Sequence, residues 1–91
     1  MGLGGRRGMV EVLVFGKEGC HLCEMVESEI RSLKKARANL TVVDIDDDEA
    51  YYAKYWMRIP VVVIDGREVL EAKDMDPEGR WKGSLSALLS R

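Results

Sequence analysis

The sequence predicts one α/β domain with the element order β-α-β-α-β-β-α, in which helices flank a mixed four-stranded sheet. Two observations support this fold class. Residues 9–15 and 40–45 are short apolar runs separated by a helical pattern, and a strand, a helix and a strand in this order form a right-handed parallel crossover. Asp65-Gly66 then lies between two further runs and predicts a tight hairpin, which adds antiparallel strands.

The first half of the chain gives one strand and one long helix. Residues 1–8 are rich in Gly and Arg and lack an apolar period, so we expect a flexible leader before a domain of residues 9–91. Residues 9–15 form the first strand and residues 16–19 a loop. From residue 21 to about residue 38, apolar residues recur every three or four positions, as in a helix with one buried face. Glutamates fill its first half and Lys and Arg its second half, which complements the helix dipole.

The second half continues with a strand over residues 40–45 and a helix over residues 50–57. The acidic residues 46–49 precede this helix, and an Asp there caps its free N–H groups. Pro60 ends the helix and makes Ile59 extended. Residues 61–64 and 67–72 are the hairpin strands. Asp76-Pro77 predicts a last helix that continues to residue 91, with Asp76 as its cap and Pro77 as its first residue.

Composition excludes several classes of function. The net charge is −2 and the hydrophobic fraction 46%, so neither a nucleic-acid partner nor a membrane partner is expected. No apolar run reaches the ~20 residues of a membrane-spanning helix. With no apparent signal peptide, we expect a cytoplasmic protein, and we expect a monomer. The chain has only two cysteines, too few for a disulfide-stapled secreted domain.

The two cysteines are the strongest candidates for chemistry. Cys20 and Cys23 follow a strand and open a helix, where free N–H groups and the helix dipole favour a thiolate on Cys20. Cys23 lies one turn further in and should be more buried. We therefore predict that Cys20 attacks a substrate disulfide and Cys23 resolves the mixed disulfide. A structural zinc site and two inert packing cysteines remain as less favoured alternatives.

Three other features have alternative interpretations. His21 either stabilises the adjacent thiolate as a cation or is a solvated ring of little effect. The aromatic residues at positions 51, 52, 55 and 56 have helical spacing, which favours core and interface roles over a cofactor-binding box. The acidic residues 44–49 are explained more simply by helix capping than by a metal site.

Three segments, residues 15–23, 43–46 and 58–69, resemble the small glutaredoxin-like proteins of the thioredoxin superfamily, whose Cys-His-Leu-Cys motif the chain carries. The resemblance extends over residues 9 to about 72. It implies a thioredoxin fold, disulfide oxidoreductase activity and a cis bond between Ile59 and Pro60 beside the cysteines. It also implies that the Ile59 backbone pairs with an extended substrate.

The chain departs from typical thioredoxins in one place and from typical glutaredoxins in another. Thioredoxins carry a buried acid in the first strand where this chain has Val14. Glutaredoxins carry a Lys three residues before the first Cys, which Lys17 matches, and a Gly-Gly after the fourth strand that helps to hold glutathione. Here that region reads Leu70-Glu71-Ala72-Lys73-Asp74, so we expect glutathione to bind weakly, as a co-substrate at most.

The resulting hypothesis is a thiol–disulfide oxidoreductase with a role in electron transport and no resident metal or cofactor. Its partners would be a disulfide-containing protein or small molecule, and a thiol reductant that is either glutathione or a reductase. We predict that Lys17, His21, Leu22, Ile59 and Pro60 contact the substrate. A thioredoxin-fold adaptor without turnover and a glutathione-assisted iron–sulfur carrier are the alternatives.

Overall fold

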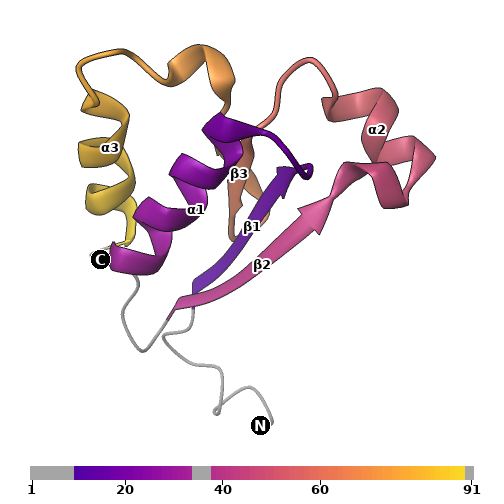
Figure 1. Ribbon diagram of the computed structural model, residues 1–91. Helices are drawn as coiled ribbons and strands as arrows, with labels where there is room; N and C mark the ends of the chain where they lie inside the picture. The colour runs from indigo at the N-terminus through magenta and orange to yellow at the C-terminus, as the bar shows by residue number, and fades with distance from the viewer. Residues whose placement is uncertain (1–9, 34–37, 90–91) are drawn as a thin grey trace, which may run out of the picture.

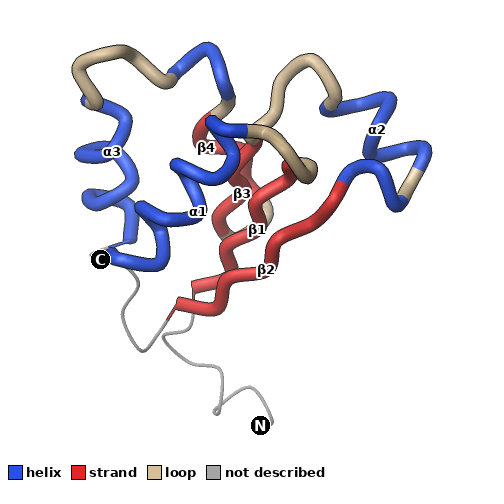
Figure 2. Tube along the Cα trace, viewed as in Figure 1, coloured by secondary structure: helices blue, strands red, loops and turns tan. Residues whose placement is uncertain are grey.

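A four-stranded sheet with the order β2-β1-β3-β4 forms the centre of the protein (Figure 1 and Figure 2). In the computed structural model, which describes residues 10–33 and 38–89, β1 (Val10–Gly16) and β2 (Ala38–Asp44) are parallel. The strands β3 (Val61–Ile64) and β4 (Arg67–Leu70) continue the sheet in antiparallel pairing. This mixed sheet, flanked by helices, confirms the predicted fold class.

Helices cover both faces of the sheet, which explains why its central strands are apolar apart from Glu11 near the start of β1. The helices α1 (His21–Leu33) and α3 (Arg80–Leu89) lie on one face and α2 (Glu49–Tyr55) on the other. Alternate residues of β1 enter the two cores: Val12 and Val14 pack with α1 and α3, and Phe15 packs with Tyr55 of α2. Short 3₁₀ helices, η2 (Ile45–Asp47) and η3 (Ala72–Asp74), follow β2 and β4.

Two local predictions are confirmed. Asp65 and Gly66 have φ angles of 50° and 83°, the pair of positive values that a two-residue hairpin turn requires. Asp48 caps α2, because its Oδ1 accepts the backbone N–H groups of Ala50 at 2.8 Å and Tyr51 at 3.1 Å. Short-range side-chain chemistry therefore determines both the hairpin and the start of α2.

Two predicted boundaries in the first half of the chain are wrong, one at the end of a helix and one at the end of a strand. The expected helix to about Ala38 ends earlier, since Ala38 and Asn39 belong to β2 and pair with Val10 and Glu11 of β1. Pairing with β1 therefore determines the structure of Ala38. Residues 34–37 lie outside the described part of the chain. The loop predicted for residues 16–19 also loses Gly16, which is the last residue of β1.

The start of α3 differs from the prediction as well. Asp76 does cap the helix, because its carboxylate accepts the N–H groups of Arg80 at 3.0 Å and Trp81 at 3.1 Å. Pro77 is not the first helical residue: a turn ending at Gly79, with a φ angle of 81°, separates it from α3. The leader predicted for residues 1–8 lies outside the described residues. In the described part, none of the helices is long and apolar enough to span a membrane.

Candidate active site

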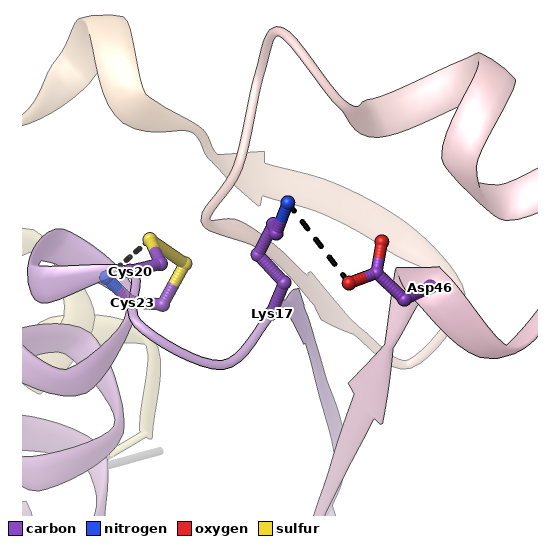
Figure 3. Close-up of a disulfide and its surroundings, with 4 residues drawn as sticks. All are labelled: Lys17, Cys20, Cys23 and Asp46. Carbon is purple, nitrogen blue, oxygen red and sulfur yellow. Dashed lines mark hydrogen bonds and ion pairs between the residues drawn. A yellow bond between two sulfur atoms is a disulfide. The ribbon is translucent and has the colours of Figure 1, made fainter.

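Cys20 and Cys23 form a disulfide at the start of α1 (Figure 3). Cys20 immediately precedes the helix and is partly exposed, whereas the side chain of Cys23, inside the first turn, is only 1% exposed. Their Cα atoms are 5.2 Å apart. The sulfur at the protein surface is therefore that of Cys20, and Cys23 lies beneath it.

The helix terminus provides donors to one of the two sulfurs. Sγ of Cys20 accepts the backbone N–H of Cys23 at 3.1 Å, the contact that an N-cap side chain makes with the third helical residue. The carbonyl of Cys20 already accepts the N–H of Glu24 at 3.1 Å, so the helix is continuous from this point. A negative charge on Cys20 would thus face both an N–H donor and the positive end of the helix dipole.

The loop from Gly16 to Cys20 is shaped by two glycines. Gly19 has a φ angle of 84°, and Cys20 N–H donates to the carbonyl of Lys17 at 3.2 Å, which closes a tight turn. A Cβ atom on Gly16 would lie 2.9 Å from Sγ and 3.0 Å from Cβ of Cys23. Any side chain at position 16 would therefore press against the buried cysteine. The sequence analysis missed this role of Gly16.

Lys17 points away from the helix start toward η2 (Figure 3). Its Nζ lies 3.9 Å from Asp46 Oδ2 and 6.0 Å from the ring centre of Tyr52. Both charged side chains are substantially exposed, so the ion pair contributes little to stability. His21 and Leu22 are exposed on the first turn of α1. Leu22 lines a groove of about 260 Å³ between α1 and the segment before α3.

The Ile59–Pro60 peptide bond is cis, as predicted. It lies at the same end of the sheet as the cysteines, because Val61, which follows it, pairs with Phe15, which precedes Gly16. Pro60 is buried, and the Ile59 N–H donates to the carbonyl of Tyr55 at 3.1 Å. Pairing of a substrate with both backbone groups of Ile59 would require release of this N–H.

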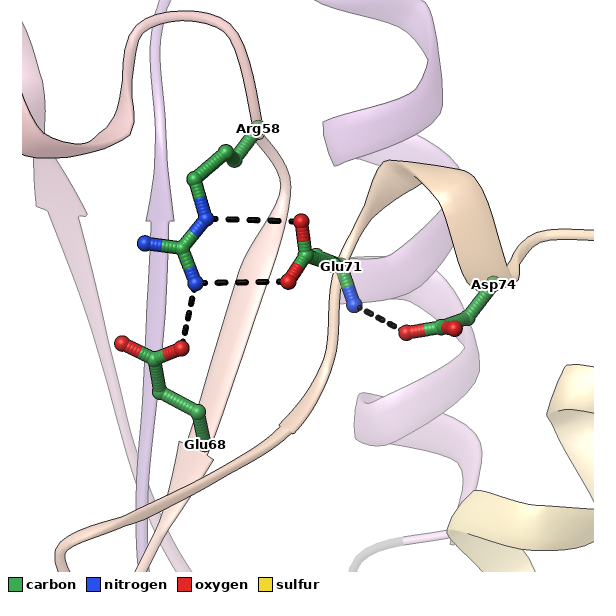
Figure 4. Close-up of polar contacts among 4 residues, drawn as sticks. All are labelled: Arg58, Glu68, Glu71 and Asp74. Carbon is green, nitrogen blue, oxygen red and sulfur yellow. Dashed lines mark hydrogen bonds and ion pairs between the residues drawn. The ribbon is translucent and has the colours of Figure 1, made fainter.

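Arg58 connects the cis-proline segment to the strand that returns from the hairpin (Figure 4). Its guanidinium donates to both carboxylate oxygens of Glu71, at 3.3 Å each, and also to Glu68. The Glu71 hydrogen bond raises the pKa of Arg58, and the same contact lowers the pKa of the Glu71 carboxyl. The carbonyl of Arg58 accepts the N–H of Ala72 at 3.0 Å. The sequence analysis gave Arg58 no role of its own and did not foresee its pairing with Glu68 and Glu71.

The region after β4, where glutaredoxins carry Gly-Gly, forms η3. Five backbone N–H groups of residues 71–76, all but that of Lys73, donate to acceptors within the protein at distances between 2.8 and 3.1 Å. Asp74 accepts the Glu71 N–H, and the Asp74 N–H donates back to the Glu71 carbonyl. The other donors engaged in this way are those of Ala72, Met75 and Asp76.

In the described part of the chain, neither a buried acid nor a cluster of metal-ligating side chains accompanies the cysteines. Val14 is fully buried, and no polar or charged side chain is buried among residues 10–33 and 38–89. Within those same residues, no group of three or more His, Cys, Asp and Glu side chains is placed to hold a metal. The groups that this arrangement brings together are the two sulfurs and the helix terminus.

Comparison with known proteins identifies one matching family and several solved structures of similar fold. The model of the glutaredoxin-like domain (DUF836) matches residues 11–82. A solved protein from Nitrosomonas europaea is 32% identical, with a TM-score of 0.62 over 80% of this chain and 91% of that one. A structural-genomics target from X. campestris is 27% identical, with a TM-score of 0.62 over 84% and 96%. A mutant thioredoxin from Halobacterium salinarum, 23% identical over 94% and 76%, has a TM-score of 0.62 and shares the fold. No curated protein sequence matches the chain significantly.

Proposed function

Because the chain belongs to the glutaredoxin-like domain family (DUF836), we propose that it is a thiol–disulfide oxidoreductase with Cys20 as nucleophile and Cys23 as resolving thiol. A thioredoxin-like fold with a CxxC pair supports a redox-type function. The observation that carries the assignment of roles is the hydrogen bond from the Cys23 N–H to Cys20 Sγ. It provides a donor for a thiolate on Cys20, the more exposed of the two sulfurs.

The proposed reaction consists of two exchange steps. The Cys20 thiolate attacks one sulfur of a substrate disulfide, which breaks the substrate S–S bond and releases one substrate thiolate. The Cys23 thiolate then attacks Sγ of Cys20, which releases the second substrate thiolate and forms the Cys20–Cys23 disulfide. Two electrons pass from the protein dithiol to the substrate. The protons lost by the two protein thiols go to water, and the released thiolates take up protons from water.

The second step depends on short-range geometry rather than on a buried base. Cys23 is covered by Gly16 and lies within disulfide distance of Cys20, so attack requires little movement. Val14 occupies the place of the thioredoxin acid, and we propose that the Cys23 proton leaves directly to solvent when the Cys20 side is open. An external thiol, either glutathione or the dithiol of a reductase, then regenerates the reduced protein.

We propose that a dithiol donor is preferred to glutathione. Lys17 can meet one ligand carboxylate, but it is held near Asp46. Most of the amide donors after β4 are engaged in η3 and in the contact with Arg58, so few are left for the second carboxylate. A charge-assisted hydrogen bond is worth about 1.5–3 kcal/mol, so loss of such contacts weakens binding by about tenfold or more.

A glutathione-coupled turnover assay on Cys23→Ser tests this mechanism. A dithiol mechanism requires both sulfurs, so the variant should lose most of its turnover, and Cys20→Ser should lose all of it. A fully active Cys23→Ser variant would establish a monothiol mechanism and contradict the proposal. The absorption spectrum of the freshly purified protein serves as a control for a bound iron–sulfur cluster.

A further inference from the structure

An exposed apolar surface lies on α2 and the two residues that follow it. It consists of Tyr51, Tyr52, Trp56 and Met57, and we call it the aromatic face. Trp56 is 53% exposed and Met57 74% exposed. The rings of Tyr52 and Trp56 are nearly parallel, at 4° and 6.2 Å between centres, and so form a continuous platform. Tyr, Trp and Met side chains are the residue types that recur at the centres of protein interfaces.

The aromatic face is continuous with the candidate active site on two sides. Lys17, in the loop that leads to Cys20, lies over the ring of Tyr52. On the other side, Trp56 and Met57 run directly into Arg58 and the Ile59–Pro60 bond. The aromatic face therefore adjoins both the loop that leads to Cys20 and the segment that carries the cis bond.

The exposed charges at the start of the aromatic face are acidic, whereas Lys54 of α2 lies over the ring of Tyr55 and Arg58 is paired with Glu68 and Glu71. Asp46, Asp47 and Glu49 are exposed at the end of η2 and the start of α2. The nearest cation of the active-site loop, Lys17, is already paired with Asp46. An occupant with basic side chains would be attracted to this rim, and a basic side chain can also stack on an exposed Tyr or Trp ring.

We infer that the aromatic face docks an extended segment of a protein substrate in which apolar and basic residues flank the reactive disulfide. This inference rests on the proposed function and specifies its substrate class as a protein disulfide rather than a small molecule. The platform takes the apolar side chains, and the acidic rim selects Lys and Arg over Asp and Glu. The ring stack supplies most of the discrimination, because large rigid side chains lose little entropy on binding.

Peptide disulfides of defined sequence test the inference on the unmodified protein. Three peptides carry one Cys as a mixed disulfide with thionitrobenzoate, flanked by Phe and Lys, by Ser and Lys, or by Phe and Glu. Release of coloured thionitrobenzoate gives the second-order rate constant of each peptide with the reduced protein. We expect the peptide with Phe and Lys to react about tenfold or more faster than the other two. Its advantage over the peptide with Phe and Glu should shrink at high salt.

Substitutions on the aromatic face then test whether its rings cause the preference for the peptide with Phe over the peptide with Ser. Trp56→Ser and Tyr52→Ser remove exposed rings without opening the core, and each should abolish most of the preference for Phe over Ser. Met25→Ser is the matched control, since Met25 is 37% exposed on α1, on the opposite face of the sheet from α2. It should leave the ratio of peptide rates as in the wild type. Equal thermal midpoints among the variants verify that all are folded.

Binding without chemistry separates this inference from the proposed function. The same peptides with Ser in place of Cys, labelled for anisotropy, report docking alone. Selective binding without any disulfide reduction would overturn the proposed function and retain the docking site. Reduction of all three peptides at equal rates, or a preference that survives loss of both rings, would overturn the docking site. A dimer that dissociates in Trp56→Ser would also overturn it, by assigning the face to a second copy of the chain.

Discussion

Gly16→Ala should destabilise the protein, because position 16 has no room for a methyl group. The added Cβ would lie 2.9 Å from Sγ and 3.0 Å from Cβ of Cys23, and Cys23 itself is fully enclosed. Overpacking of this kind costs about 1–3 kcal/mol. The lower entropy of the unfolded chain returns about 0.4–1 kcal/mol, so the net loss is about 1.3 kcal/mol at the midpoints of the two ranges. For a domain of this size, 1 kcal/mol shifts the midpoint by about 4–8 °C.

Gly83→Ala provides the matched control for this experiment. Gly83 lies inside α3, and a Cβ there meets nothing within 4 Å. The same substitution should therefore stabilise the protein by about 0.5–1 kcal/mol. The assay is thermal and urea denaturation of both variants, oxidised and reduced, since the contact with Cys23 Cβ does not depend on the disulfide. A Gly16→Ala variant as stable as the wild type would refute the close-packing argument.

Three further predictions concern charge and reactivity. Reduced Cys20 should be alkylated by iodoacetamide at lower pH than free cysteine, and an unchanged curve in His21→Ala would mean that the histidine has little effect. The N–H groups of the first turn of α3 hold the pKa of Asp76 below its usual value. The Asp76 carboxylate therefore stabilises the protein fully above about pH 4, and this stabilisation is lost as pH falls through the lowered pKa. The free energies of unfolding of wild type and Asp76→Asn should consequently converge on acid titration. Arg58→Lys cannot keep the two-oxygen contact with Glu71, and it should raise KM for peptide disulfides while leaving the alkylation rate of Cys20 unchanged.

Features set by neighbouring residues were predictable from the sequence. The Asp65-Gly66 turn, the Asp48 cap and the cysteines at the start of α1 each depend on a few adjacent positions. The strand–helix–strand pattern also indicated the parallel pairing of β1 and β2, because a crossover through a helix returns the chain to the end of the sheet from which it started. The fold class therefore followed from local patterns combined with one rule of topology.

Features set by contacts between distant residues were not predictable in the same way. Glu71 lies thirteen positions after Arg58, and only the hairpin brings the two together. The enclosure of Cys23 by Gly16 depends on how α1 packs against the end of β1. The first helix was expected to extend to about residue 38, but pairing with Val10 places that residue in β2. In each case the contacting residue is distant in sequence, so helix and strand propensities and the spacing of apolar residues cannot predict the contact.

The most direct test of the account compares the two single-cysteine variants as nucleophiles. Reduced Cys23→Ser and Cys20→Ser are each mixed with a peptide disulfide of thionitrobenzoate near neutral pH, and mass spectrometry follows the adducts. We predict that Cys23→Ser reacts rapidly and accumulates a mixed disulfide on Cys20. Cys20→Ser should react about tenfold or more slowly, because its remaining sulfur is buried and lacks the terminal N–H donor. A first adduct that forms as fast on Cys23 as on Cys20 would contradict the assignment of nucleophile and resolving thiol.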